Sequence, residues 1–122
     1  MADTTPQTSV LVISSLVATS EVGGGVTAQM LAAHTIRPCL VPTVILGRHP
    51  ALGAPGGGPV TTALMGSALD GVKANGALEA VDAIFTGYFQ NPDQVRLAAG
   101  LIAQARASRP DLLVMVDPIL GD

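Results

Sequence analysis

The sequence has few of the groups that bind nucleic acid or cross a membrane. Only six of its 122 residues are Lys or Arg, against nine acidic residues, and the formal net charge is -3. Trp is absent, and one Tyr and two Phe offer little surface for base stacking. No apolar run approaches the ~18 residues of a membrane span, and residues 1–9 do not resemble a signal peptide. We therefore expect no nucleic-acid partner, no membrane partner and a cytoplasmic location.

Cysteine is nearly absent as well. The single Cys39 cannot form an internal disulfide, which fits a reducing compartment, and its neighbours supply no Cys/His pattern for a metal. We expect Cys39 to be a small core residue. Apolar residues, in contrast, make up 48% of the chain, enough to build a core. A chain of 122 residues with this composition is therefore long enough for one compact domain.

Strand-like and helix-like segments alternate along the chain. Residues 9–14, 39–46, 81–87 and 112–117 are short and apolar, which is typical of parallel strands buried on both faces. Helices are predicted over 26–34, 61–76 and 91–109. This alternation predicts an α/β fold, a parallel sheet with helices on both faces and right-handed crossovers. Pro42 predicts that the second strand lies at an edge or ends near Thr43.

Two of the predicted helices carry patterns that define a face. Thr61 and Asn91 are good N-cap residues, and Pro92 suits the first helical position. We expect Leu64, Ala68 and Val72 to share one face of the second helix, and Val95, Ala98, Ala99 and Ile102 to point inward from the third. Residues 47–60, rich in Gly and Pro, are interpreted as a functional loop with room for a short hairpin rather than as a linker.

Candidate functional residues follow the predicted strands. In open α/β sheets, ligands bind beyond the carboxyl ends of the strands, so these residues should gather at one rim. They are Ser14, Ser15, Thr43, Thr86, Gly87, Tyr88, Asp117 and Asp122. Residues 23–28 match a dinucleotide fingerprint in form. That interpretation is disfavoured because the first glycine does not follow the first strand directly and no acidic residue ends the second strand.

The two aspartates and two histidines allow more than one interpretation. Asp117 and Asp122 could share the water shell of one Mg²⁺, or each could bind its own turn backbone, and the residues alone leave both open. His34 lies at the predicted end of a helix, where a structural role is favoured. His49 lies in the long loop, and the sequence leaves open whether it lines a pocket.

Four segments together resemble one family. VISSLVATSEVG, VPTVILGRHPALGAPGG, AIFTGYF and VMVDPILGD occur in this order and resemble the N-terminal part of pyridoxal kinases, within the ribokinase-like superfamily. The resemblance implies a ribokinase-like fold, truncated here after the fourth core strand. It implies transfer of the γ-phosphoryl group of ATP to the 5′-hydroxyl of pyridoxal or a related vitamin B6 compound. It further implies Mg²⁺, often a monovalent cation such as K⁺, and a homodimer.

The resemblance also assigns roles to residues. It implies that Ser15 hydrogen-bonds the pyridine ring and that Val22 touches it. Leu46, His49 and Pro50 would belong to the segment that covers the substrate, and Tyr88 would also face the pyridoxal. Asp117 and Asp122 would face the ATP phosphates and their metal, through water. The site residues that the resemblance implies are therefore Ser15, Val22, Leu46, His49, Pro50, Tyr88, Asp117 and Asp122.

The chain departs from the family pattern in several places. Residues 48–50 read Arg-His-Pro where many members have Asn-His-Thr, Leu16 stands where a histidine often follows the serine, and residues 56–58 are three glycines. The family's catalytic base lies in a Gly-x-Gly-Asp motif that does not occur here, so we expect no catalytic residue before position 122 and a longer parent protein. The alternatives are another ribokinase-like kinase, for a hydroxymethyl-pyrimidine or a sugar, and a non-catalytic ligand-binding half-domain.

Overall fold

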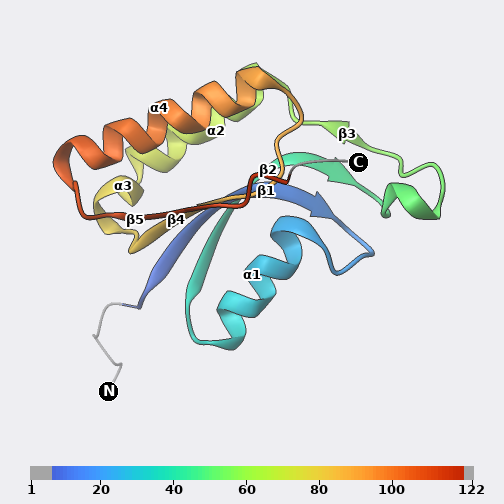
Figure 1. The fold of residues 1–122 in the computed structure, drawn as a ribbon, viewed down its shortest axis with the longest axis horizontal. Coiled ribbons are helices and arrows are strands. Elements are labelled where there is room, and N and C mark those ends of the chain that lie inside the picture. The colour runs from blue at the N-terminus through green and yellow to red at the C-terminus, as the bar shows by residue number, and fades with distance from the viewer. Residues whose placement is uncertain (1–6, 120–122) are drawn as a thin grey trace.

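The fold is built on a five-stranded sheet with the order β3-β2-β1-β4-β5. The structure is a computed structural model and describes residues 7–119 (Figure 1). β1, β2, β4 and β5 run parallel, and only the two-residue β3 runs antiparallel, beside β2. This confirms the predicted parallel sheet. The strands are β1 (Ser9–Val17), β2 (Arg37–Leu46), β3 (Gly58–Pro59), β4 (Ala83–Thr86) and β5 (Leu113–Val116).

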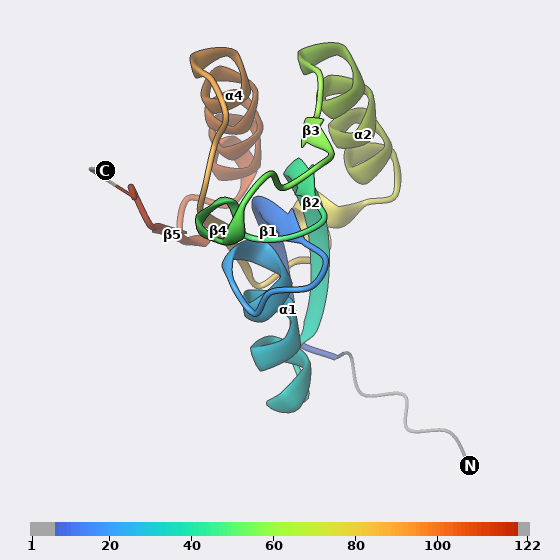
Figure 2. The same ribbon diagram turned by 90° about the vertical axis from the view of Figure 1, so that its right-hand side faces the viewer.

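Helices cover both faces of this sheet, as predicted. Figure 2 shows α1 on one side of the strands and α2 and α4 together on the other. A four-residue helix, α3, was not expected, and it connects α2 to β4. The helical elements are α1 (Gly23–Ala33), η1, a 3₁₀ turn (Pro50–Leu52), α2 (Thr62–Ala74), α3 (Ala77–Ala80) and α4 (Pro92–Ser108).

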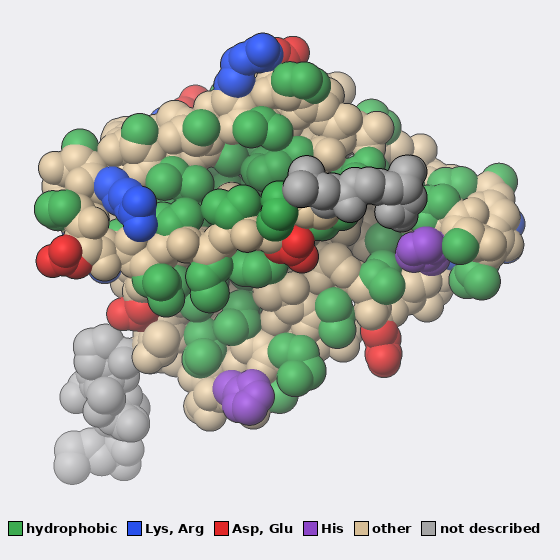
Figure 3. All heavy atoms as spheres, viewed as in Figure 1, with side chains coloured by type: hydrophobic (Ala, Val, Ile, Leu, Met, Phe, Trp, Pro, Cys, Tyr) green, Lys and Arg blue, Asp and Glu red, His purple; other side chains and the backbone are tan. Residues whose placement is uncertain are grey.

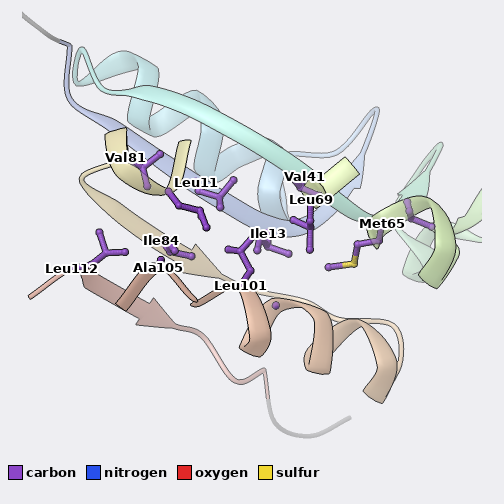
Figure 4. Close-up of a cluster of buried hydrophobic side chains, with 13 residues drawn as sticks. Leu11, Ile13, Val41, Met65, Leu69, Val81, Ile84, Leu101, Ala105 and Leu112 are labelled. Carbon is purple, nitrogen blue, oxygen red and sulfur yellow. The ribbon is translucent and has the colours of Figure 1, made fainter. Parts of the chain in front are cut away.

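The main core lies between the sheet and the pair α2 and α4. Leu11 and Ile13 of β1 are fully buried against Met65 of α2 and Leu101 of α4 (Figure 4). Val10 and Val12 point to the other face, into a smaller cluster on the side of α1. Because alternate residues of β1 enter two different clusters, β1 is buried on both faces, as its unbroken apolar run predicts.

The predicted faces of two helices are partly wrong. Leu64 of α2 is 60% exposed, and the neighbouring Met65 and Leu69 are buried instead. In α4, Ala98 and Ile102 pack inward as predicted, but Val95 is 46% exposed and Ala99 is exposed. Helical spacing gives the width of an apolar face, whereas the rotation of the helix depends on how its ends are anchored to the sheet. The buried positions of α4 are Gln94, Ala98, Leu101 and Ala105.

Pro42 and the long loop after β2 behave largely as expected. β2 does not end near Thr43 but continues to Leu46, and β3 pairs with it only at Val44 and Ile45. Pro42 therefore lies where β2 has no outer neighbour in the described chain, which suits a residue without an N–H. Cys39 is partly buried and packs against the main core. β2 and β3 pair as the short hairpin that residues 47–60 allow, with η1 in the connection between them.

β5 forms one edge of the described sheet and exposes apolar side chains. Leu113 is 56% exposed, Met115 41% and Val116 63%. Figure 3 shows hydrophobic side chains gathered along β5 and on the surface on either side of it. Within residues 7–119, no helix has both the length and the apolar character needed to span a bilayer.

Candidate active site at the carboxyl ends of the strands

The carboxyl ends of the four parallel strands meet at one rim, as predicted. Gly87, just after β4, donates its backbone N–H to the carbonyl of Ile13 in β1 (2.9 Å). Asp117, just after β5, donates its N–H to the carbonyl of Thr86 at the end of β4 (2.9 Å). The residue that follows β4 and the residue that follows β5 are thus each hydrogen-bonded to the neighbouring strand. Figure 2 looks onto this end of the molecule.

Tyr88 is held at this rim through both its backbone N–H and its backbone carbonyl. Its N–H donates to Ser14 Oγ (3.1 Å), and its carbonyl accepts from Thr43 Oγ1 (2.7 Å). Ser14 and Thr43 are 2% and 0% exposed, so their hydroxyl groups hold the backbone and do not face a ligand. Tyr88 as a whole is 36% exposed, and its hydroxyl donates to Gln90 Oε1 (3.0 Å). These two hydrogen bonds fix the backbone of Tyr88, while the residue remains exposed at the surface.

Ser15 lies where the first turn of α1 packs on β1. The pairing register of β1 and β2 shifts between Ser14 and Leu16, so Ser15 sits in an irregular part of the sheet. The side chain of Ser15 occupies the place where a Cβ of Gly23 would be, and Gly23 has φ +61°. The helix begins at Gly23 rather than at the predicted residue 26, with Val22 as its N-cap. The glycines allow this close approach because they lack a Cβ.

The loop after β1 contacts the loop after β2. Thr19 Oγ1 donates to the carbonyl of Gly47 (2.6 Å), and the N–H of His49 donates to Ser20 Oγ (3.3 Å). His49 Nδ1 accepts from the N–H of Ala51 (3.0 Å) and so caps η1, whose first residue is Pro50. The structure therefore places the predicted residues Leu46, His49 and Pro50 beside the segment that contains Val22.

Asp117 follows β5 directly and is exposed. Its Oδ1 accepts the N–H of Ile119 (3.2 Å), which is the local turn bond that one interpretation predicts. No donor within residues 7–119 bonds its second carboxylate oxygen, so metal-linked water could still be held there. The described residues contain no group of three His, Cys, Asp or Glu side chains that could hold a metal by themselves. Asp122 lies outside the described residues.

Two hollows of the described surface lie beside α1. One is formed by residues 16–21 with α1, and the other lies between α1 and Phe85 and is apolar. His34 is the C-cap residue of α1 and lines the apolar hollow. Neither Tyr88 nor Asp117 lines either of them. Neither of these two hollows therefore encloses the part of the rim at Tyr88 and Asp117.

Comparison with known proteins agrees with this arrangement. No protein-family model matches the chain. Over 113 residues the chain is 37% identical to the pyridoxine/pyridoxal/pyridoxamine kinase of Bordetella avium, an alignment that covers 93% of this chain and 38% of that protein. The chain is homologous to pyridoxal kinases. It spans about two fifths of the length of the pyridoxal kinases it matches.

Solved pyridoxal kinases have the same fold over the matched part. The pyridoxal kinase of Entamoeba histolytica superposes with a TM-score of 0.89 at 28% identity, covering 95% of this chain and 41% of that one. The pyridoxal kinase of Leishmania donovani in complex with ADP and pyridoxamine gives 0.86 at 28% identity, covering 93% and 40%. These pyridoxal kinases confirm the predicted ribokinase-like fold for this part of the protein.

One residue at the rim was missed by sequence reasoning. Gln94 is fully buried and bonds three separate segments near Tyr88. A signal was present, because Asn91 followed three residues later by Gln94 matches the capping-box spacing that marks a helix start. That pattern points only to a local cap. The bonds from Gln94 to residues 34 and 51 positions away have no counterpart in the sequence.

Proposed function

We propose that the protein containing this chain is an ATP-dependent pyridoxal kinase, which transfers the γ-phosphoryl group of ATP to the 5′-hydroxyl of pyridoxal or a related B6 vitamer. The observation that carries this proposal is the rim at the carboxyl ends of β1, β4 and β5, where Ser15, Tyr88 and Asp117 lie, in a chain homologous to such kinases over 93% of its length. The relative named for pyridoxine, pyridoxal and pyridoxamine, and the neighbour bound to ADP and pyridoxamine, support this choice of substrates.

The substrate side is proposed to lie between the end of β1 and Tyr88. Ser15 is only 8% exposed, so a hydrogen bond from its hydroxyl to a pyridine nitrogen would form with little competition from water. Val22 is half-buried and supplies an apolar wall, and the exposed Tyr88 ring suits contact with an aromatic ligand. The hairpin with Leu46, His49 and Pro50 would cover the substrate and exclude water. Pro50 offers no hydroxyl there.

The phosphate side is proposed to lie at Asp117, together with Asp122. An exposed carboxylate with one oxygen free of described donors fits Mg²⁺, which keeps several waters and binds through one or two carboxylates plus substrate phosphates. The ion would supply charge neutralisation on the phosphates. Asp117 would hold water on the ion and orient it. K⁺ as a further cation, a homodimer and a cytoplasmic location complete the proposal.

Proton removal from the 5′-hydroxyl is assigned to a residue outside this chain. Within residues 7–119 the rim and its hairpin offer a hydroxyl, a phenol, the His49 imidazole and one carboxylate, and the resemblance gives none of them the role of base. The matched kinases are about two and a half times as long as this chain, which leaves room for that residue. What this part of the protein would contribute is binding and orientation, which can account for much of the rate of phosphoryl transfer.

The substitution Asp117→Asn in the full-length protein tests this proposal. A residue that acts on a metal through water typically contributes about 10- to 100-fold to activity, so kcat for pyridoxal 5′-phosphate formation should fall by about that factor. Asp111→Asn is the matched control, because Asp111 is also exposed and lies before β5, at the opposite end of the strand. A wild-type protein that forms no pyridoxal 5′-phosphate from pyridoxal and Mg-ATP would refute the function. Wild-type rates in Asp117→Asn would remove only Asp117 from it.

A further inference from the structure

Gln94 is a fully buried side chain that uses both ends of its amide group. Its Nε2 donates to the carbonyls of Thr43 (2.9 Å) and Val60 (2.8 Å), and its Oε1 accepts the N–H of Gln90 (2.8 Å). It is 0% exposed, although it lies in the first turn of α4. A buried amide is costly unless its hydrogen bonds are made, and here both donors and one acceptor site are used.

The three partners of Gln94 belong to the segments that carry the proposed substrate contacts. Thr43 is the residue whose hydroxyl holds the carbonyl of Tyr88. Gln90 follows Tyr88 by two positions, and its side chain accepts the Tyr88 hydroxyl. Val60 directly follows β3, where the covering hairpin returns to the sheet. One side chain therefore connects the Tyr88 loop and the base of the hairpin to a helix of 17 residues.

The phosphate side of the rim is attached differently. Asp117 is joined to Thr86 and to its own turn at Ile119, and no bond of Gln94 reaches either of them. A change at Gln94 should therefore move the substrate side of the rim and leave the position of Asp117 nearly unchanged.

Helix capping does not account for this side chain. Asn91 already caps α4, because its Oδ1 accepts the backbone N–H of Gln94 (3.0 Å). In a capping box the side chain three residues later bonds the N–H of the cap residue itself. Gln94 instead bonds the N–H of Gln90, one residue earlier, and directs its two donors to β2 and to Val60.

We propose that Gln94 is a positioning residue for the B6 vitamer: it sets the spacing between Tyr88 and the hairpin over residues 47–59 without touching the substrate. This inference rests on the proposed function. Only an amide of this length offers two donors and an acceptor at these positions. Glutamate keeps the acceptor and loses both donors, and methionine keeps the shape and loses all three bonds.

Kinetics of the full-length protein with Gln94→Met and Gln94→Glu test the proposal. Misplacing a contact by ~1 Å can cost up to about a hundredfold, so we expect KM for pyridoxal to rise at least about tenfold while KM for ATP changes less than about twofold. The control is Gln104→Met, an exposed glutamine of the same helix, which should leave both constants unchanged. Equal rises in the two KM values, or no rise for pyridoxal, would overturn the role.

Amide hydrogen exchange gives a second readout that does not depend on activity. Exchange over residues 58–60 and 87–90 should increase in both Gln94 variants and not in Gln104→Met, while β1 stays protected. If the wild-type protein has no kinase activity, the proposed function fails, and exchange still decides whether Gln94 holds these segments. If the Gln94 variants do not fold, Thr43→Val, which removes only the bond to Tyr88, must give the same selective rise in KM for pyridoxal. Without that rise the inference is wrong.

Discussion

The contact between α1 and β1 at Gly24 allows a stability prediction with an internal control. A Cβ added at Gly24 would lie 2.7 Å from the carbonyl oxygen of Ser15 and 2.8 Å from Leu40 Cδ1. Well-packed carbon atoms stay about 3.5–4.0 Å apart, and the Ser15 carbonyl belongs to a central strand that cannot easily move. Overpacking of this kind costs about 1–3 kcal/mol, against a gain of about 0.5–1 kcal/mol from replacing a helical glycine.

We therefore expect Gly24→Ala to lower the free energy of unfolding by about 1–2 kcal/mol. Gly25→Ala is the control in the same helical turn, because its Cβ would be 3.6 Å from its nearest neighbour, an ordinary contact. Gly25→Ala should raise stability by about 0.5–1 kcal/mol. The assay is urea unfolding of the full-length variants side by side, comparing midpoints at unchanged slope.

The comparison is decisive because the two substitutions should change the free energy of unfolding in opposite directions. If Gly24→Ala is as stable as the wild type or more stable, the packing argument for the glycine run is wrong. A second consequence concerns the proposed function, because a displaced first turn of α1 moves Val22, its N-cap residue, relative to Ser15 in β1. KM for pyridoxal should then rise in Gly24→Ala and stay near the wild-type value in Gly25→Ala.

Two further substitutions probe the hairpin and α3. Gly57 has φ +69° and an added Cβ would overlap the carbonyl of Ile45, whereas Gly56, also at φ +69°, faces open space. Gly57→Ala should therefore raise KM for pyridoxal more than Gly56→Ala. Equal KM values in the two variants would count against a covering role for the hairpin. Arg109 donates to the backbone carbonyls of Leu78 (2.9 Å) and Val81 (2.6 Å) at α3. Arg109→Met should therefore lower the free energy of unfolding by about 1–3 kcal/mol, measured by thermal unfolding. Arg37→Met, a change at an exposed arginine, should not reproduce this loss.

Much of the sheet could be predicted because its strands carry a strong local signal. The run that contains Leu11 and Val12 is apolar at every position, and both faces of β1 are in fact buried. Thr61 and Asn91 marked the starts of two helices correctly, since a capping side chain acts on its own helix. The rotation of α4 could not be predicted, because it follows from the burial of Gln94 among distant partners.

The candidate site could be predicted in position but not in detail. The rule that ligands bind beyond the ends of parallel strands correctly selected Tyr88 and Asp117 for one rim. It also selected the hydroxyl groups of Ser14 and Thr43, which are turned inward and hold the Tyr88 backbone. These bonds join residues 74 and 45 positions apart, and no local pattern reveals whether a hydroxyl is used in this way.

The central place of β1 in the sheet has a consequence for synthesis on the ribosome. Ser9 and Asp82 exchange two hydrogen bonds, Ser9 N–H to Asp82 Oδ2 (2.9 Å) and Asp82 N–H to the Ser9 carbonyl (2.8 Å), across 73 residues. At ~5–20 residues per second, β1 waits about 4–15 s for this partner. Until then the apolar strand β1 is paired only with β2, and its other edge is open. During this interval the nascent chain most needs protection from association with other chains.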